Sequence, residues 1–318
     1  MTATRLAIII GCLLAGLFSP TDNGRRNRGA RGTGPLPPHA AHDAGGEGVC
    51  SRAERSEHES AAPSRQPHSS CLRGRRHEGI RFHPTRAQQN RPRVRAARQR
   101  RLEDIRLLFA KAALDYPPRQ VLLRAFKNDG VLELWVQPAR GRPYVHLKDY
   151  TICMRSGELG PKRRRGDGQV PEGFYRITWF NPHSQFLLSM KVDYPNRSDR
   201  IRGGRHPGGD IFIHGSCVTI GCLPLTDRWI EELYLIALDS HWRYGRRPLV
   251  HIFPTRLDDA GMSWLEKTYR HRPELVEFWR ELRPGYLYFE HHHRPAPVRI
   301  GRDGTYHFQE NNGDRPAK

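Results

Sequence analysis

The distribution of large aromatic residues sets the strongest limit on where this chain can fold. All 6 Trp and all 11 Tyr of the 318-residue sequence lie after position 100. The first 100 residues hold 18 Arg, no Lys and 7 acidic residues. A segment so poor in large apolar side chains cannot offset the entropy of ordering, so we expect residues 20–100 to be disordered. The sequence thus predicts a folded domain at 101–290 and a polar tail at 291–318.

A short apolar run near the N-terminus indicates export. Residues 6–17 follow Arg5 and are too few to span a bilayer, but they match the apolar part of a secretory signal. We therefore expect residues 1–19 to be a signal peptide or an uncleaved membrane anchor. The four Arg between positions 25 and 31 oppose this, because they reverse the usual positive-inside bias.

The charge of the chain favours an anionic partner. Of the formal net charge of +20, 11 charges come from the first 100 residues and 9 from the remainder. Cell-wall polymers, acidic lipid headgroups and nucleic acid all fit such a surface. The Arg-rich segment lacks interleaved aromatic residues and any recognisable nucleic-acid module, so we expect no nucleic-acid partner.

The rest of the chain predicts a mainly β architecture with peripheral helices, an α+β sandwich or barrel. Stretches rich in alternating apolar residues predict strands, and apolar residues at helical spacing predict helices. The expected strands cover 121–127, 131–137, 144–154, 174–180, 186–194, 211–214 and 248–254, and the expected helices cover 97–114, 227–240, 258–269 and 273–282.

Candidate chemistry gathers in residues 209–227. His214 ends a short strand pattern and precedes Gly215, which lets the chain turn. Gly221 directly precedes Cys222 and suggests a backbone position with φ > 0 or a close approach of another group. A cysteine on a turn before a helix N-terminus, with a histidine on the adjoining loop, is typical of a thiol active site.

This arrangement predicts a nucleophile and a base. A free cysteine has a pKa of about 8.5 and reacts as the thiolate, so catalysis at neutral pH needs a nearby imidazole or a positive helix end. We assign Cys222 as the nucleophile and His214 as the general base. The amides of Gly221 and Cys222 are expected to stabilise an oxyanion. The competing interpretation of Cys222 is a small buried apolar residue.

Other polar residues near this segment suggest binding roles. Loops that flank a strand-end site commonly line its groove, although Tyr194-Pro195-Asn196 also has the composition of a turn. The predicted substrate-binding residues are Tyr194, Asn196, Asp199, Arg205 and Ser216. A zinc site is the chemical alternative, but the spacing of its ligands matches no common zinc pattern, so we expect no metal and no organic cofactor. Its ligands would be His206, Asp210, His214, Cys217 and Cys222.

Four ordered motifs between residues 120 and 254 resemble the L,D-transpeptidase catalytic domain family (YkuD-like). They are Gly157-Glu158-Leu159-Gly160-Pro161-Lys162, the stretch from Gly166 to Tyr175, Val192-Asp193-Tyr194-Pro195-Asn196, and the segment from His214 to Cys222. The resemblance implies a β-sandwich or barrel, a Cys-His pair and peptidoglycan stem peptides as substrates. It also implies a place in the periplasm or cell envelope.

The resemblance departs from the family pattern at two positions. The usual pattern has a longer His-to-Cys interval and ends in Ser-His-Gly-Cys followed closely by Arg. Here Thr219-Ile220-Gly221-Cys222 lacks the second His, and Leu223-Pro224 lacks the Arg. The chain therefore resembles a short-loop branch that includes enzymes releasing wall-attached lipoprotein. The alternative that these departures suggest is a catalytically inactive peptidoglycan-binding envelope protein.

The positions of the cysteines allow a disulfide if the domain is exported. Cys12, Cys50 and Cys71 precede the predicted domain, and three others lie within it. If the domain is exported, Cys153 and Cys217 can pair while Cys222 stays free.

Overall fold

The computed structural model describes residues 86–309. The expected signal peptide or anchor (residues 1–19) and residues 20–85 of the expected disordered segment lie outside the described residues, as do residues 310–318 of the tail. None of the helices in the described part is both long enough and apolar enough to cross a membrane.

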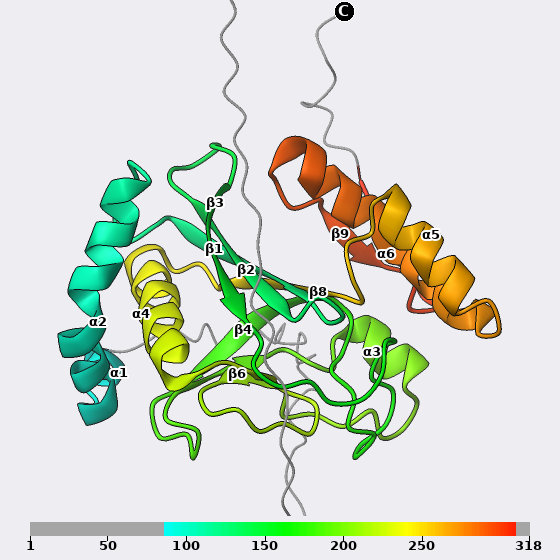
Figure 1. Cartoon of the computed structure of the whole chain (residues 1–318), viewed down its shortest axis with the longest axis horizontal. Coiled ribbons are helices and arrows are strands. Elements are labelled where there is room, and N and C mark those ends of the chain that lie inside the picture. The colour runs from blue at the N-terminus through cyan, green and yellow to red at the C-terminus, as the bar shows by residue number, and fades with distance from the viewer. Residues whose placement is uncertain (1–85, 310–318) are drawn as a thin grey trace, which may run out of the picture. The chain divides into compact units, whose positions relative to one another are not determined.

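A sheet of eight strands forms the centre of the described part (Figure 1). Its members are β1 (Gln120–Phe126), β2 (Val131–Gln137), β3 (Val145–Thr151), β4 (Gly173–Asn181), β5 (Ser189–Val192), β6 (Phe212–His214), β7 (Leu223–Pro224) and β8 (Leu249–Phe253). They lie in the order β3-β2-β1-β8-β4-β5-β6-β7. The prediction of a mainly β fold with peripheral helices is confirmed.

The sheet begins with the predicted hairpin. β1 and β2 pair antiparallel from Gln120 opposite Gln137 to Phe126 opposite Val131. Gly130, in the connecting turn, has a φ of +67°, a conformation that glycine adopts without steric cost. β8 then adds to β1 in parallel, which places the last strand of the sheet beside the first.

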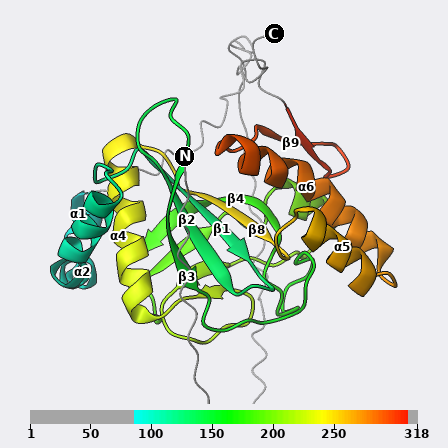
Figure 2. The ribbon, with the colours of Figure 1, turned by 45° about the horizontal axis from the view of Figure 1, so that its top comes forward.

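Two apolar cores cover the two faces of β1. Leu123 and Ala125 belong to the core beneath α4 (Asp227–Tyr244), and Phe126 belongs to the core beneath α6 (Pro273–His292). Figure 2 shows α4 on one side of the sheet and α6, with α5 (Asp259–Thr268), on the other. Because successive strand residues point to opposite faces, β1 is buried on both.

The helical layer outside α4 corrects the expected disorder at residues 86–100. These residues form α1 (Arg86–Gln89) and the first half of α2 (Pro92–Lys111), and Val94 is fully buried. Arg98 donates two hydrogen bonds to Asp239 of α4, at 2.7 and 2.6 Å. Two of the Arg residues that suggested disorder, Arg98 and Arg100, therefore pair with acidic residues of α4.

The expected polar tail is also partly wrong. α6 continues to His292 despite Pro284, and β9 (Val298–Ile300) pairs with β10 (Tyr306–Phe308). The hairpin packs tightly on the helix, because a Cβ at Gly285 would lie 2.2 Å from a ring carbon of Phe308. This close contact holds the hairpin against α6.

Candidate active site

Two short strands at one edge of the sheet bring the predicted catalytic residues together. β6 and β7 run parallel, with Ile213 opposite Leu223 and His214 opposite Pro224. When this register is extended by one residue, Cys222 lies opposite Phe212, two positions from His214 on the same face. Strand pairing thus brings together two residues that are eight positions apart in the sequence.

His214 is buried and oriented. Its Nδ1 donates a hydrogen bond to the carbonyl oxygen of Gly215 at 2.6 Å, which fixes the proton on Nδ1. Its ring stacks on Phe186 with centroids 4.5 Å apart. Burial lowers the pKa of His214, and the Gly215 hydrogen bond only partly opposes this. Nε2 has no hydrogen bond within residues 86–309 and remains the basic nitrogen.

Cys222 is the free cysteine of the described part of the chain. Its Sγ lies 3.7 Å from the carbonyl oxygen of Asp210. Burial raises the pKa of the thiol, and the charge of Asp210 raises it further, while the amide of Phe212 and the ammonium of Lys162 lower it. Burial therefore favours the neutral thiol of Cys222 and the neutral imidazole of His214. Cys222 lies on a bend, as expected, but the two residues of β7 separate it from the start of α4.

Thr219 holds the backbone around the nucleophile. Its Oγ1 accepts from the amides of Cys222 at 2.8 Å and Gly221 at 3.2 Å, and it donates to the carbonyl of Cys222 at 2.9 Å. Both amides thus have an acceptor within the fold, and their predicted oxyanion role stays a prediction. The hydroxyl of Thr219 holds the backbone on both sides of the Cys222 amide.

The expected backbone role of Gly221 is confirmed. Its φ is +133°, which L-residues rarely adopt, and a Cβ there would lie 3.0 Å from the carbonyl oxygen of Gln169. Both expected reasons for a glycine before the cysteine apply.

A disulfide joins Cys153 to Cys217, as the export hypothesis predicted. Cys153 follows β3, and Cys217 lies in the loop between β6 and β7, which we call the catalytic loop (residues 215–222). The bond therefore ties the middle of the catalytic loop to the opposite end of the sheet. It also removes Cys217 from the zinc alternative, and the residues 86–309 contain no group of three or more His, Cys, Asp or Glu arranged to hold a metal.

Two of the predicted substrate residues, Tyr194 and Asp199, are buried, and Asn196 is partly buried. Asn196 caps α3 (Arg197–Arg202) by accepting from the amide of Asp199 at 3.0 Å. The Asp199 carboxylate accepts from Tyr175 at 3.0 Å, and burial raises its pKa to about 6. Tyr194, only 3% exposed, donates to the carbonyl of Pro207 at 2.7 Å. These polar groups are used within the fold, and their contact with substrate stays a prediction.

The other two predicted residues differ in position. Ser216 lies in the catalytic loop, and its amide donates to Asp227 at 2.9 Å. Its side chain remains partly exposed. Arg205 is exposed in the loop after α3 and has no ion pair among residues 86–309. Contact of either residue with substrate stays a prediction.

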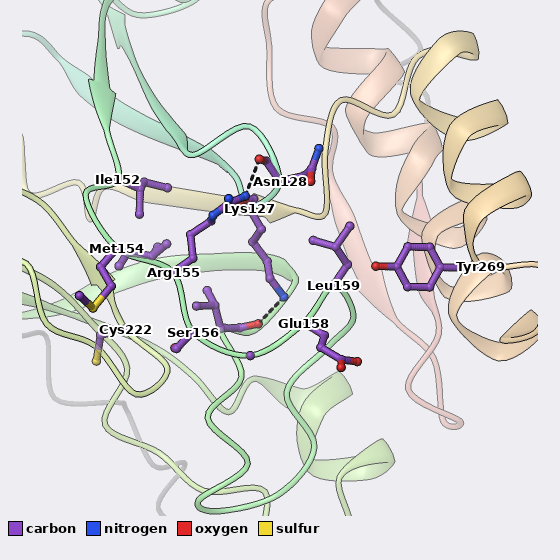
Figure 3. A pocket seen from close by; sticks show the side chains of 13 residues that line it. Lys127, Asn128, Ile152, Met154, Arg155, Ser156, Glu158, Leu159, Cys222 and Tyr269 are labelled. Carbon is purple, nitrogen blue, oxygen red and sulfur yellow. Dashed lines mark hydrogen bonds between the residues drawn. The ribbon is translucent and has the colours of Figure 1, made fainter. Parts of the chain in front are cut away.

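A pocket of about 460 Å³ opens beside Cys222 (Figure 3). Cys222 and Met154 lie on one side, and Tyr269 faces them from the helical side. None of the five predicted substrate residues is among the described residues that line it. The lining consists of Lys127, Asn128, Ile152, Met154, Arg155, Ser156, Gly157, Glu158, Leu159, Val170, Cys222, Leu223 and Tyr269.

Comparison with known proteins decides the family. A family profile described as L,D-transpeptidase catalytic domain (YkuD) matches residues 116–249. The chain is also 36% identical over 184 residues to "Putative L,D-transpeptidase YafK" of Escherichia coli K12 and of O157:H7, covering 57% of this chain and 70% of the relative. This chain belongs to the L,D-transpeptidase catalytic domain family. Membership supports a peptidoglycan-related, transpeptidase-like function.

Solved structures show more distant likenesses. The helical cell shape determining protein Pgp2 of Campylobacter jejuni is 17% identical, with 57% of this chain and 73% of that chain covered and a TM-score of 0.36. Bd1075 of Bdellovibrio bacteriovorus is 20% identical, with 51% and 57% covered and a TM-score of 0.31. At these values the likenesses carry no functional inference for this chain.

The sequence contained signals for residues that we did not predict. Thr219 stands three positions before Cys222, where a hydroxyl can reach two successive amides. Arg155 lies two residues after Cys153, so the expected disulfide already placed it near the catalytic loop. The stacking of Phe186 on His214 had no sequence signal, because it depends on the pairing of β5 with β6.

Proposed function

We propose that this protein is a cysteine acyltransferase of the cell envelope that acts on peptidoglycan stem peptides. Family membership supplies the substrate class. The observation that carries the chemistry is the free thiol of Cys222 at the edge of a pocket, directly before β7, which pairs with the strand of an oriented His214.

The first step forms a thioester. His214 Nε2 takes the proton from Cys222 Sγ as the sulfur attacks the carbonyl carbon that follows the L-centre of a diamino acid. The tetrahedral intermediate then collapses, the C–N bond breaks, and His214 returns the proton to the leaving amine. The acyl group remains on Cys222. Because both groups rest neutral, the proton moves during attack and not before it.

The second step decides the outcome. An amine acceptor attacking the thioester gives a new cross-link, whereas water gives hydrolysis at the same type of bond, including release of a wall-attached lipoprotein. His214 accepts the proton of the attacking group, and the thiol of Cys222 is regenerated. Side chains of this chain suffice for every proton transfer in this scheme.

The proposed location is the periplasm or cell envelope. The family acts on the cell wall, and the Cys153–Cys217 disulfide is typical of proteins in an oxidising compartment. Attachment to the membrane through residues 1–19 belongs to the same proposal.

The direct test incubates isolated peptidoglycan, with and without attached lipoprotein, with the protein and with Cys222→Ala, followed by mass spectrometry. New cross-links or loss of a terminal residue only with Cys222 present would support acyl transfer, and release of lipoprotein alone would support the hydrolytic form. Unchanged wall material with both proteins would contradict the proposal.

A catalytically inactive peptidoglycan-binding protein is the second candidate. The raised pKa of Cys222 and the Thr219 bonds to the two backbone amides favour it, because neither a thiolate nor free oxyanion donors are in place. The rate of Cys222 alkylation separates the two. An enzyme should lose reactivity when His214 is replaced by Ala, whereas a binding protein should label slowly in both forms.

A further inference from the structure

The pocket beside Cys222 holds two charged side chains, Arg155 and Glu158, and Arg272 lies close enough to Glu158 for their charges to interact. Neither Arg155 nor Glu158 forms an ion pair with any residue in the range 86–309, and both are exposed. Arg155 donates to the backbone carbonyls of Asn128 at 2.7 Å and Lys127 at 3.4 Å. These neutral acceptors orient the guanidinium in the pocket wall without neutralising its charge (Figure 3).

The other cation of the pocket is used within the fold. Lys127 Nζ is buried, pairs with Glu172 at 2.9 Å and donates to the carbonyls of Gly160 and Val170, both at 2.9 Å. Arg155 is therefore the pocket cation that is open to an incoming anion, among the residues described.

Two neutral hydroxyls complete the lining. Ser156 Oγ is buried and has no hydrogen-bond partner in the described part of the chain, although a buried hydroxyl usually has one. Tyr269 follows α5, outside residues 116–249 that match the catalytic domain. Burial raises the pKa of Tyr269, and the charge of Glu158 raises it further, so its hydroxyl stays protonated and can donate. The C-terminal helices thus contribute one wall of a pocket on the catalytic domain.

We propose that this pocket binds an amino-acid end of the substrate peptide that carries both a carboxylate and an ammonium group. Arg155 binds the carboxylate, Glu158 binds the ammonium, and the hydroxyls of Ser156 and Tyr269 supply neutral hydrogen bonds. This assignment rests on the proposed function, because Cys222 lines the same pocket. It supplies, from the segment that follows β3, the cation that is absent at Leu223-Pro224.

Magnitudes favour selectivity through Arg155. An exposed ion pair contributes little, but a guanidinium held in a pocket wall can bind a carboxylate through two parallel hydrogen bonds. Loss of a hydrogen bond to a charged group corresponds to roughly a tenfold to hundredfold loss of binding. The pocket volume lies within the range that holds small ligands.

The test compares three synthetic stem tetrapeptides on the full chain. The peptides differ at the end of the side chain of their third residue. In the first peptide the terminal carbon bears an amine and a carboxylate, and in the second the carboxylate is amidated. The third peptide ends in an amine alone. We expect kcat/KM to be about tenfold to hundredfold higher for the first peptide. Arg155→Gln should remove this preference, Arg155→Lys should keep part of it, and Arg200→Gln, at an exposed Arg on α3, is the control that keeps it all.

The proposed contact of Glu158 with the ammonium group has a test of the same kind. Acetylation of the side-chain amine should weaken binding to the unmodified protein, and Glu158→Gln should be insensitive to it. Equal kcat/KM for the carboxylate and amide peptides, or a preference that persists in Arg155→Gln, would overturn the assignment.

A binding readout separates this inference from the proposed function. Peptides that occupy the pocket should slow alkylation of Cys222 by iodoacetamide, whether or not they are turned over. Protection by the carboxylate peptide that disappears in Arg155→Gln, without turnover of any peptide, would support the pocket and contradict acyl transfer. Turnover without discrimination would contradict the pocket alone.

Discussion

Polar side chains hold the backbone in two segments, the catalytic loop (residues 215–222) and the segment around α3 (residues 194–207). The consequences for the site differ between the two. Both connect elements next to β6, and both contain side-chain oxygens that accept from backbone amides, those of Asn196 and Asp199 in one and that of Thr219 in the other. In the α3 segment, the bonds of Asn196 and Asp199 end within the fold. In the catalytic loop, the bonds of Thr219 end at the backbone of Cys222, whose side chain reaches a pocket.

This difference shows that the type of a polar residue near a predicted site does not establish its role. Chemical type did not distinguish the two segments, because Asp199 is as suitable for binding substrate as any residue of the catalytic loop. What distinguishes them is whether the hydrogen-bonding capacity is already used, which follows from burial. Asp199 is 1% exposed, whereas Cys222 is partly open. Changes in the α3 segment should therefore alter stability, and changes in the catalytic loop should alter catalysis.

The largest expected effect comes from removing the disulfide with Cys153→Ala and Cys217→Ala together. The bond closes a sequence separation of 64 residues, and its loss should lower the free energy of unfolding by about 2–4 kcal/mol. Urea denaturation of the variant and of reduced protein should agree. Catalysis should also fall, because the catalytic loop loses its tie to β3. A fully active variant would show that the bond does not position the loop.

The second effect is a dependence of stability on pH at Asp199. Its pKa is raised by burial to about 6 in the fold, so the folded state binds more protons than the unfolded state above the ordinary value of 3.8. The contribution of this group to stability should therefore fall as pH rises from about 4 to 6, by at most about 3 kcal/mol. The difference in unfolding free energy between the protein and Asp199→Asn should show this slope. A difference that is flat with pH would contradict it.

The third effect concerns Thr219 in the catalytic loop. Thr219→Val removes the hydroxyl that holds Gly221 and Cys222, and kcat should fall by about tenfold to hundredfold while the melting temperature changes little. Thr219→Ser keeps the hydroxyl and is the matched control. An increase of kcat in Thr219→Val would instead show that the released amides bind the oxyanion.

The smallest effect tests the α3 segment. Asn196→Ala removes the cap of α3 and should cost about 1 kcal/mol of stability, with kcat unchanged at a temperature where the variant is folded. A loss of kcat without loss of stability would restore Asn196 as a substrate contact.

The strands of the sheet other than the two-residue β7 could be predicted, because each carries its own apolar pattern. β2 has the bounds that its sequence indicated, and β1 differs by one residue at each end. The six-residue helix α3 has no apolar period, although Asn196 and Asp199 at a spacing of three form a capping pair that signalled it. α6 was cut short in the prediction at Leu282, because Pro284 and Gly285 usually end a helix. Its packing against Phe308 is a tertiary contact that local sequence does not contain.

For the site, the sequence indicated features that depend on local backbone conformation. It did not indicate features that depend on contacts between distant segments. Gly221 and the pairing of Cys153 with Cys217 follow from local and compartment arguments. The pKa shifts of His214 and Cys222 depend on burial. The pocket is lined by the segments that follow β1 and β3 and by the end of α5, which are far apart in the chain. No spacing within one segment contains that information.

The central claim is that Cys222 carries an acyl group during turnover. Intact-protein mass spectrometry after brief mixing with a stem tetrapeptide tests it, followed by peptide mapping and with Cys222→Ala as the control. The account predicts an added mass equal to the peptide without its leaving residue, located on Cys222 and absent from the variant. Turnover of the peptide with no adduct on Cys222, or an equal rate in the variant, would contradict it.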